Sequence, residues 1–230
     1  MADIEISGPD GRFNAYLAQP SATPAPSIVV IQEIFGVNDV MRELCDSFAA
    51  RGYNAICPDL FWRLEPNVQI TDKTDAEWQK AFDLMGRFDP DKGVEDLKTT
   101  LHHLRGLENC TGKAASVGYC LGGKLAYMMA CRSDADCNVA YYGVGLDQML
   151  DEARNIRKPL LMHMATEDQF VPKDAQARIR EGLRTQEQVQ IFVYEGNEHA
   201  FAREGGAHYD PAAASLANER TMDFLKQHLS

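Results

Sequence analysis

The stretch Ala115-Ser-Val-Gly-Tyr-Cys-Leu-Gly-Gly-Lys-Leu-Ala126 decides the fold of this chain. Small and apolar residues lead to Gly118, a single thiol follows at Cys120, and two more glycines precede a helix-like pattern. The pattern predicts a strand, a sharp turn that carries a nucleophile, and then a helix. The glycines have a steric reason, because residues two positions before and after such a nucleophile pack together and leave little room for a Cβ.

This spacing resembles the nucleophile elbow of the α/β-hydrolases, with cysteine in the place that serine usually takes. The helix after the elbow points its N-terminal amides at the turn, where they favour a thiolate or an oxyanion. We therefore expect Cys120 to be the nucleophile. The expected oxyanion donors are the backbone N–H groups of Leu121, directly after it, and of Ile34, on the first long loop.

Strands and helices alternate on both sides of the elbow. The β-branched run Ser27–Glu33 is typical of a buried parallel strand, and Asn38 and Gly52 are signals for the start and end of the next helix. Predicted strands are residues 3–7, 12–18, 27–33, 53–57, 115–119, 138–142, 159–164 and 189–194, and predicted helices are residues 38–51, 74–87, 90–106, 121–132, 173–185 and 212–229.

The alternation predicts a mostly parallel sheet with right-handed crossovers and helices on both faces, preceded by an N-terminal antiparallel hairpin. We expect one α/β-hydrolase domain over residues 1–230. Sites in such sheets lie at the carboxyl ends of the strands, so each catalytic residue should follow a strand.

Composition limits the classes of partner. The net charge is −11 and no basic cluster occurs, which argues against nucleic acid. The start lacks a signal-peptide pattern and no apolar run has transmembrane length, so we expect a cytoplasmic protein without a membrane partner. The six cysteines show neither a C-x-x-C pair nor zinc-ligand spacing. We expect reduced thiols, no metal, no cofactor and a monomer.

A thiol nucleophile needs a base, and the base needs an orienting acid. In this fold the chain order is nucleophile, acid, base. His199 closely follows the last predicted strand and is the expected base, while His208 stays possible. His163 lies inside an apolar strand and reads as a core residue, and His228 lies near the chain end.

Asp168 follows the strand at residues 159–164 and is the expected acid. An aspartate before a proline-containing turn can also serve only to cap the turn. Glu167 is the rival acid.

Glu33 is a carboxylate at the end of a predicted buried strand. It can be a solvated group at the strand exit. If it faces Cys120, its charge raises the pKa of the thiol and keeps it protonated, or it accepts the thiol proton when substrate arrives.

Several stretches together resemble the dienelactone hydrolase (carboxymethylenebutenolidase) family, and they span nearly the whole chain in the right order. They are Gln32-Glu-Ile-Phe-Gly36, Gly118-Tyr-Cys-Leu-Gly-Gly123, Tyr141-Tyr-Gly-Val-Gly-Leu146, His163-Met164, Asp168-x-Phe-Val-Pro172, His199-Ala-Phe-Ala-Arg203 and Leu216-Ala-Asn-Glu-Arg220.

The resemblance implies a Cys120–His199–Asp168 triad with Glu33 as a fourth member, which holds the resting thiol and takes up its proton as substrate binds. The thiolate then attacks a small carboxylated enol-lactone, the ring opens, and an acyl-thioester is hydrolysed. The product from dienelactone is maleylacetate, in the catabolism of chlorinated aromatic hydrocarbons.

The family also binds the substrate carboxylate with two arginines. Arg203 matches one of them, although it can also be a solvated loop charge. The other is expected near residue 78, where this chain has Trp78 with Lys80 close by. Phe35 and Tyr142 match positions that line the substrate site, and each can equally be plain core.

Three other functions stay open: hydrolysis of another small ester or lactone, a ligand-binding sensor on a hydrolase fold, and a redox protein that uses Cys120 as a sulfenylated thiol. The sequence places no resolving cysteine for the last of these.

Overall fold

The computed structural model describes residues 1–230 as two compact units, Met1–Ala115 and Ser116–Ser230. The strands are β1 (Ala2–Gly8), β2 (Gly11–Ala18), β3 (Ala25–Ile31), β4 (Asn54–Pro58), β5 (Cys110–Tyr119), β6 (Cys137–Tyr141), β7 (Leu160–Ala165) and β8 (Val189–Tyr194). The helices are α1 (Asp39–Ala50), α2 (Asp75–Arg87), α3 (Pro90–Arg105), α4 (Leu121–Arg132), α5 (Lys173–Leu183) and α6 (Pro211–Leu229), with 3₁₀ turns η1 (Leu146–Gln148) and η2 (Leu150–Asn155).

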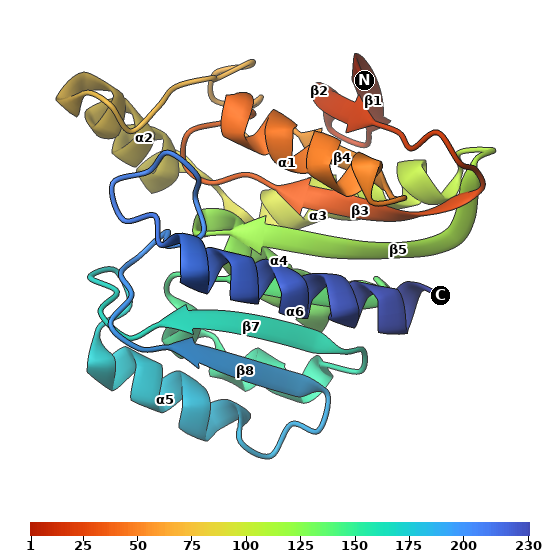
Figure 1. The fold of residues 1–230 in the computed structure, drawn as a ribbon. Coiled ribbons are helices and arrows are strands. Elements are labelled where there is room, and N and C mark those ends of the chain that lie inside the picture. The colour runs from red at the N-terminus through yellow and green to blue at the C-terminus, as the bar shows by residue number, and fades with distance from the viewer. The chain divides into compact units, whose positions relative to one another are not determined.

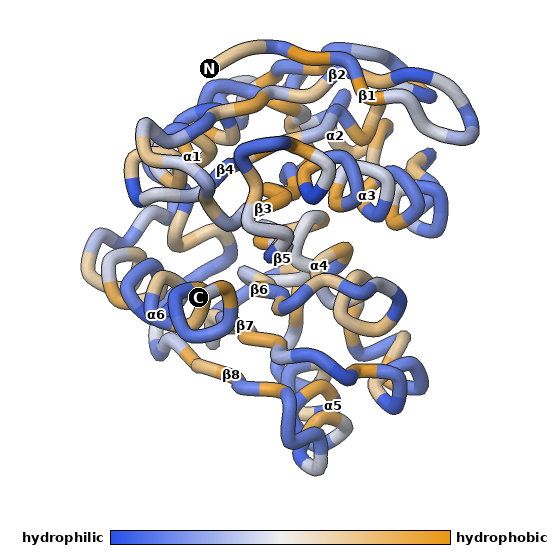
Figure 2. Tube along the Cα trace, turned by 90° about the vertical axis from the view of Figure 1, so that its right-hand side faces the viewer, coloured by the Kyte–Doolittle hydropathy of each residue, from blue (hydrophilic) through white to orange (hydrophobic).

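The first unit contains the predicted hairpin and the first parallel strand pair. Strands lie in the order β1-β2-β4-β3, with β1–β2 and β2–β4 antiparallel and β3–β4 parallel. Helix α1 covers one face of these strands and α3 covers the other (Figure 2). Helix α3 buries Val94, Leu97, Leu101 and Leu104 against them, which is the apolar stripe expected from helical spacing.

The second unit has the strand order β5-β6-β7-β8, and the pairs β6–β7 and β7–β8 are parallel. Strands β7 and β8 run side by side in the same direction (Figure 1). Helix α6 lies on one face of these strands, and α4 and α5 lie on the other (Figure 2). The carboxyl ends of β5, β7 and β8 lead into the loops that carry Cys120, Asp168 and His199.

The predicted α/β class and the antiparallel hairpin are confirmed. Asn38 caps α1 by accepting from the Met41 N–H, and Gly52 follows the helix at φ +93°, as their sequence signals indicate. Strand β3 stops at Ile31, two residues before the predicted end, and β5 begins at Cys110, five residues early. The early part of β5 is polar and largely exposed, so its sequence lacks the apolar signal of a buried strand.

None of the helices is both long enough and apolar enough to cross a lipid bilayer.

Candidate active site

Cys120 lies on a strained turn between β5 and α4. Its φ is +57°, in the left-handed region that non-glycine residues rarely adopt. A Cβ on Gly118 would come 1.9 Å from the carbonyl oxygen of Gly122. Only glycine fits at position 118, which is the steric reason expected from the sequence.

The start of α4 packs closely against the end of β6. The Cys120 N–H donates to the Tyr141 carbonyl at 3.1 Å, and a Cβ on Gly123 would lie 2.4 Å from that same oxygen. Leu121 is the first residue of α4. Its N–H therefore belongs to the group of first-turn amides that have no acceptor within the helix.

His199 and Asp168 form a buried pair. Nδ1 of His199 lies 2.7 Å from Oδ2 of Asp168, and the side chains are 7% and 2% exposed. The other carboxylate oxygen of Asp168 accepts from the N–H groups of Phe170 at 2.8 Å and Val171 at 3.2 Å. The acid is thus held on one side by its own turn and on the other by the imidazole.

The rival residues lie elsewhere. Glu167 is 47% exposed and pairs with Lys173 at 2.6 Å. His208 pairs with Glu198 at 2.8 Å and is 35% exposed. His163 is buried and bonded to two hydroxyl groups, as expected for a core histidine. Neither His208 nor His163 bonds to Asp168, and Glu167 does not bond to His199.

The electrostatics of His199 depend on its neighbours. Burial lowers its pKa, but the negative charge of a Cys120 thiolate and the hydrogen bond to Asp168 outweigh burial and raise the pKa of His199 to about 10. Nε2 is buried, and interaction with the Cys120 side chain contributes to the upward shift of the pKa. The imidazolium is therefore favoured while Cys120 is negatively charged, and it is disfavoured when that charge is removed.

Aromatic rings fix the orientation of the imidazole. Tyr142 and Phe170 each meet the His199 ring edge-on, with centroids at 5.1 and 4.8 Å. Tyr142 (φ +38°) and Ala200 (φ +61°) are, like Cys120, non-glycine residues with positive φ. Strained backbone thus gathers around this site, as it often does at functional sites.

Arg203 is buried, at 9% exposed, and not a solvated loop charge. The backbone N–H of Arg203 donates to the Ala200 carbonyl at 2.9 Å, so Arg203 lies one turn after His199. A Cβ on Gly206 would come within 2.8 Å of Nε of Arg203, so the glycine leaves room for the guanidinium stem.

Glu33, Ile34 and Phe35 belong to the first unit and are all buried. Burial of Glu33 is inconsistent with a solvated strand exit. The loop packs closely against residues 68–70. The Ile70 N–H donates to the Phe35 carbonyl at 3.1 Å, and Gly36 lies so near Val68 that a Cβ on it would be 1.8 Å from the Val68 carbonyl oxygen.

Trp78, at the position where the resemblance leads us to expect an arginine, is part of an aromatic cluster. Its ring meets Phe35 edge-on at 5.1 Å and stacks on Phe82 at 5.4 Å, and its indole N–H donates to the Asp72 carbonyl. Lys80 pairs with Glu65 at 2.5 Å. Lys80, the cation nearest in sequence to Trp78, is therefore already paired with a carboxylate.

Two residues near Asp168 were missed at the level of sequence. Phe170 covers His199, and its place in the Asp168-x-Phe-Val-Pro172 stretch was the available signal. Gln176 bonds to the turn that carries Asp168. No sequence pattern pointed to it. No group of three His, Cys, Asp or Glu side chains is placed to hold a metal ion.

The fold is that of the α/β-hydrolases. A crystal structure of a Klebsiella pneumoniae protein, provisionally described as a dienelactone hydrolase, has a TM-score of 0.86 and 25% identity over 98% of each chain. An esterase from Pyrococcus furiosus, 15% identical, has a TM-score of 0.72 over 100% of this chain and 93% of its own, and it shows the same fold.

Within this class, the chain belongs to the dienelactone hydrolase family, whose sequence profile matches residues 13–229. A relative from Azospirillum brasilense, provisionally named a carboxymethylenebutenolidase, is 55% identical over 100% of both chains. The carboxymethylenebutenolidase of Pseudomonas putida is 40% identical over 96% of this chain and 94% of its own. The predicted family and the assignment as a hydrolase are confirmed.

Proposed function

We propose that this protein hydrolyses a small carboxylated enol-lactone, of the dienelactone-to-maleylacetate type, through an acyl-thioester on Cys120. The observation that carries the proposal is the buried His199–Asp168 pair, joined at 2.7 Å, whose imidazole responds to the charge of Cys120 on its strained turn. Membership of the family and relatives named carboxymethylenebutenolidase support the reaction class.

The first half of the reaction forms the thioester. The Cys120 thiolate attacks the lactone carbonyl carbon while His199 holds a proton as imidazolium. The carbonyl oxygen becomes an oxyanion, for which we propose the N–H groups of Leu121 and Ile34 as donors. The intermediate then collapses, the ring C–O bond breaks, and the released enolate takes the proton from His199 and ketonises.

The second half releases the product. Acylation removes the negative charge from Cys120, so the pKa of His199 falls and the neutral imidazole becomes a base. It takes a proton from water, the resulting hydroxide attacks the thioester carbonyl, and the C–S bond breaks to regenerate the thiolate. Asp168 keeps the imidazole oriented through both halves.

We propose Glu33 as the fourth member, which holds the resting thiol, takes up its proton as substrate binds, and returns that proton to the regenerated thiolate once the product has left. Its burial supports a role in the protein interior over that of a solvated charge.

We also propose that residues 1–230 act as a single domain. A cytoplasmic location suits a reaction that needs a reduced thiol.

For the substrate, we propose that Arg203 binds the carboxylate and that Phe35 and Tyr142 contact the ring. Trp78 favours a second candidate, hydrolysis of an aryl or other small ester, because it presents an aromatic cluster with Phe35 instead of a second cation. A comparison of kcat/KM for cis- and trans-dienelactone with that for aryl esters distinguishes the two.

Arg203→Ala tests the carboxylate contact. We expect kcat/KM for dienelactone to fall about 10- to 100-fold, the size of one lost charge-assisted hydrogen bond, while uncharged aryl esters lose less than about threefold. Steady-state kinetics on both substrates measure it. An equal loss on both substrates assigns Arg203 a structural role, and no loss on either removes it from the site.

A further inference from the structure

We propose that Gln176, on the first turn of α5, is a positioning residue for the catalytic acid: it holds the turn Thr166–Val171 so that Asp168 meets His199. The inference rests on the proposed role of Asp168.

The turn is attached on both sides of Asp168 by one amide group. Nε2 of Gln176 donates to the Val171 carbonyl at 2.7 Å and to the Thr166 carbonyl at 3.2 Å. Gln176 itself is buried, at 9% exposed. A buried amide that bonds to the two ends of a loop fixes the separation of those ends.

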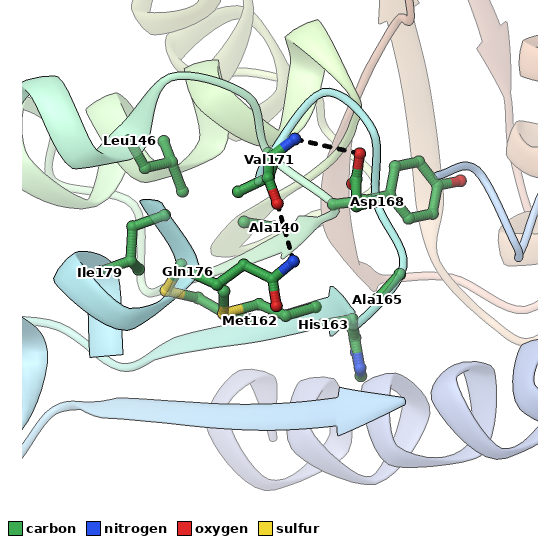
Figure 3. A pocket seen from close by; sticks show the side chains of 12 residues that line it. Ala140, Leu146, Met162, His163, Ala165, Asp168, Val171, Gln176 and Ile179 are labelled. Carbon is green, nitrogen blue, oxygen red and sulfur yellow. Dashed lines mark hydrogen bonds between the residues drawn. The ribbon is translucent and has the colours of Figure 1, made fainter. Parts of the chain in front are cut away.

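Val171 passes this restraint to the acid. Its carbonyl accepts from Gln176, and its N–H donates to Oδ1 of Asp168 at 3.2 Å, so both groups of one residue are engaged (Figure 3). The Phe170 N–H donates to the same oxygen at 2.8 Å. A displaced Val171 therefore rotates the carboxylate whose other oxygen bonds to His199.

The two halves of the turn are held by different means. The N–H of Thr166 donates to the Tyr194 carbonyl, and that of Glu167 donates to the Asn197 carbonyl at 2.8 Å, so the first half is tied to β8 and its following loop by backbone. The Val171 half is tied to α5 through the Gln176 side chain. Substitution of Gln176 thus frees the half of the turn that supplies both N–H groups to Asp168.

The cavity beside the turn has few polar side chains, and two of them, Asp168 and His163, already have hydrogen-bond partners. This cavity is lined largely by apolar side chains, among them Leu146, Met162 and Ile179, with Gln176 at its wall (Figure 3). On α5 itself, Ile179 lies one turn after Gln176 and is buried and apolar, while the neighbouring Arg180 is exposed.

The experiment compares Gln176→Met and Gln176→Glu with Ile179→Ala. The first two keep the length of the side chain and remove the N–H donors, while Ile179→Ala takes packing from the same cavity and leaves the donors in place. For each variant we would measure Tm, kcat and KM for the lactone, and the pKa of His199 by NMR titration of ¹⁵N-labelled histidine.

We expect both Gln176 variants to lose about 10- to 100-fold in kcat with KM changed less than about threefold, as for a misplaced catalytic group. The pKa of His199 should fall in Gln176→Met, because the Asp168 hydrogen bond that raises it is weakened, whereas the new carboxylate of Gln176→Glu opposes that fall. Ile179→Ala should lower Tm while kcat stays within about threefold and the pKa of His199 does not move.

The inference is overturned if the Gln176 variants keep wild-type kcat and His199 pKa, or if Ile179→Ala loses as much as they do at equal Tm. Asp168→Asn in the same assays separates the role of the His199–Asp168 pair from the positioning role of Gln176. If Asp168→Asn is fully active, the proposed function of the pair fails; if only the Gln176 variants are, the positioning role alone fails.

Discussion

Two buried histidines of the second unit have opposite pKa shifts. Burial, with a smaller contribution from the charge of Arg220, lowers the pKa of His163 to about 3. Burial also lowers the pKa of His199, but the charge of Cys120 and the bond to Asp168 overcome it and raise that pKa to about 10. His163 is bonded to the hydroxyls of Tyr194 at 2.8 Å and Thr221 at 2.9 Å, whereas Nδ1 of His199 lies 2.7 Å from the carboxylate of Asp168.

Since both histidines are buried, the charge of the hydrogen-bond partner, and not the degree of burial, decides which of them can hold a proton. Neutral hydroxyls satisfy His163 without favouring its charged form. The bond of Thr221 to the Tyr141 hydroxyl at 2.7 Å extends this neutral network between β6, β7 and α6. His163 thus joins core elements together, and His199 is the histidine suited to acid–base chemistry.

The largest expected effect is that of Cys120→Ala, which removes the thiol that we propose as nucleophile. Lactone hydrolysis should fall by about 10⁴-fold or more, as for loss of a covalent nucleophile. The pKa of His199 should fall as well, while that of His163 stays low. Steady-state kinetics and ¹⁵N-histidine titration measure both quantities, and circular dichroism checks the fold.

Wild-type-like turnover in Cys120→Ala would exclude a thiol nucleophile. An unchanged His199 pKa in the same variant would mean that the charge of Cys120 does not cause the upward shift.

Asp168→Asn removes the carboxylate that bonds to His199 and should reduce kcat about 10³- to 10⁴-fold, because the amide misorients the imidazole and no longer stabilises its charge. The pKa of His199 should fall again. Glu167→Gln is the matched control, since Glu167 is exposed and paired with Lys173. A comparable loss in the control would return Glu167 as the acid.

Sequence patterns predicted the strands and α-helices of both units and the pairing of Asp168 with His199. Strand ends can be read from apolar runs, and the chain order of an α/β-hydrolase places an acid and a base after particular strands. Residues 146–155, which form two 3₁₀ turns, were not predicted, because short turns have no apolar period.

Side-chain partners were the harder part. The amide of Gln176 and the ring of Phe170 act through contacts that depend on how α5 and the turn after β7 pack. The burial of Glu33 and Arg203 also had to be seen in the structure, since a charged residue in a loop has the same sequence signature whether it is solvated or enclosed.

His163→Gln tests, through the free energy of unfolding, whether His163 is buried in its neutral form. The pKa of folded His163, about 3, lies below its ordinary value of 6.5, so between these values the unfolded chain binds a proton that the folded chain does not. The stability that the neutral histidine supplies is present above pH 6.5 and is lost as pH falls toward 3. Wild type should therefore lose roughly 3 kcal/mol from this group between pH 7 and pH 4.

Urea unfolding at the two pH values measures this loss in wild type and in His163→Gln. Glutamine has no titrating group, so the variant should lose roughly 3 kcal/mol less on acidification. Equal acid sensitivity in both proteins would show that His163 is not buried in its neutral form.

Arg220→Met should have the smallest effect. The guanidinium lies 3.9 Å from the Phe192 ring centroid and contributes to the low pKa of His163. Its removal should raise that pKa by less than about one unit, and loss of the cation–π contact should reduce the free energy of unfolding by about 1 kcal/mol. A fall in the pKa of His163 would reverse the sign assigned to Arg220.

The most direct test of the central claim is to trap the acyl-enzyme. Trypsin cleaves after Lys113 and Lys124, which gives the peptide Ala114–Lys124 with Cys120 as its single cysteine. The enzyme is mixed with dienelactone and quenched in acid within its first turnovers. It is then digested briefly with trypsin near neutral pH, where a thioester survives, and analysed by mass spectrometry, with Cys120→Ala treated in parallel. We expect the peptide to gain the full mass of the ring-opened lactone, neutral hydroxylamine to remove this adduct, and Cys120→Ala to show no adduct. Turnover without an adduct on this peptide, or an adduct that persists in Cys120→Ala, would contradict the thioester mechanism.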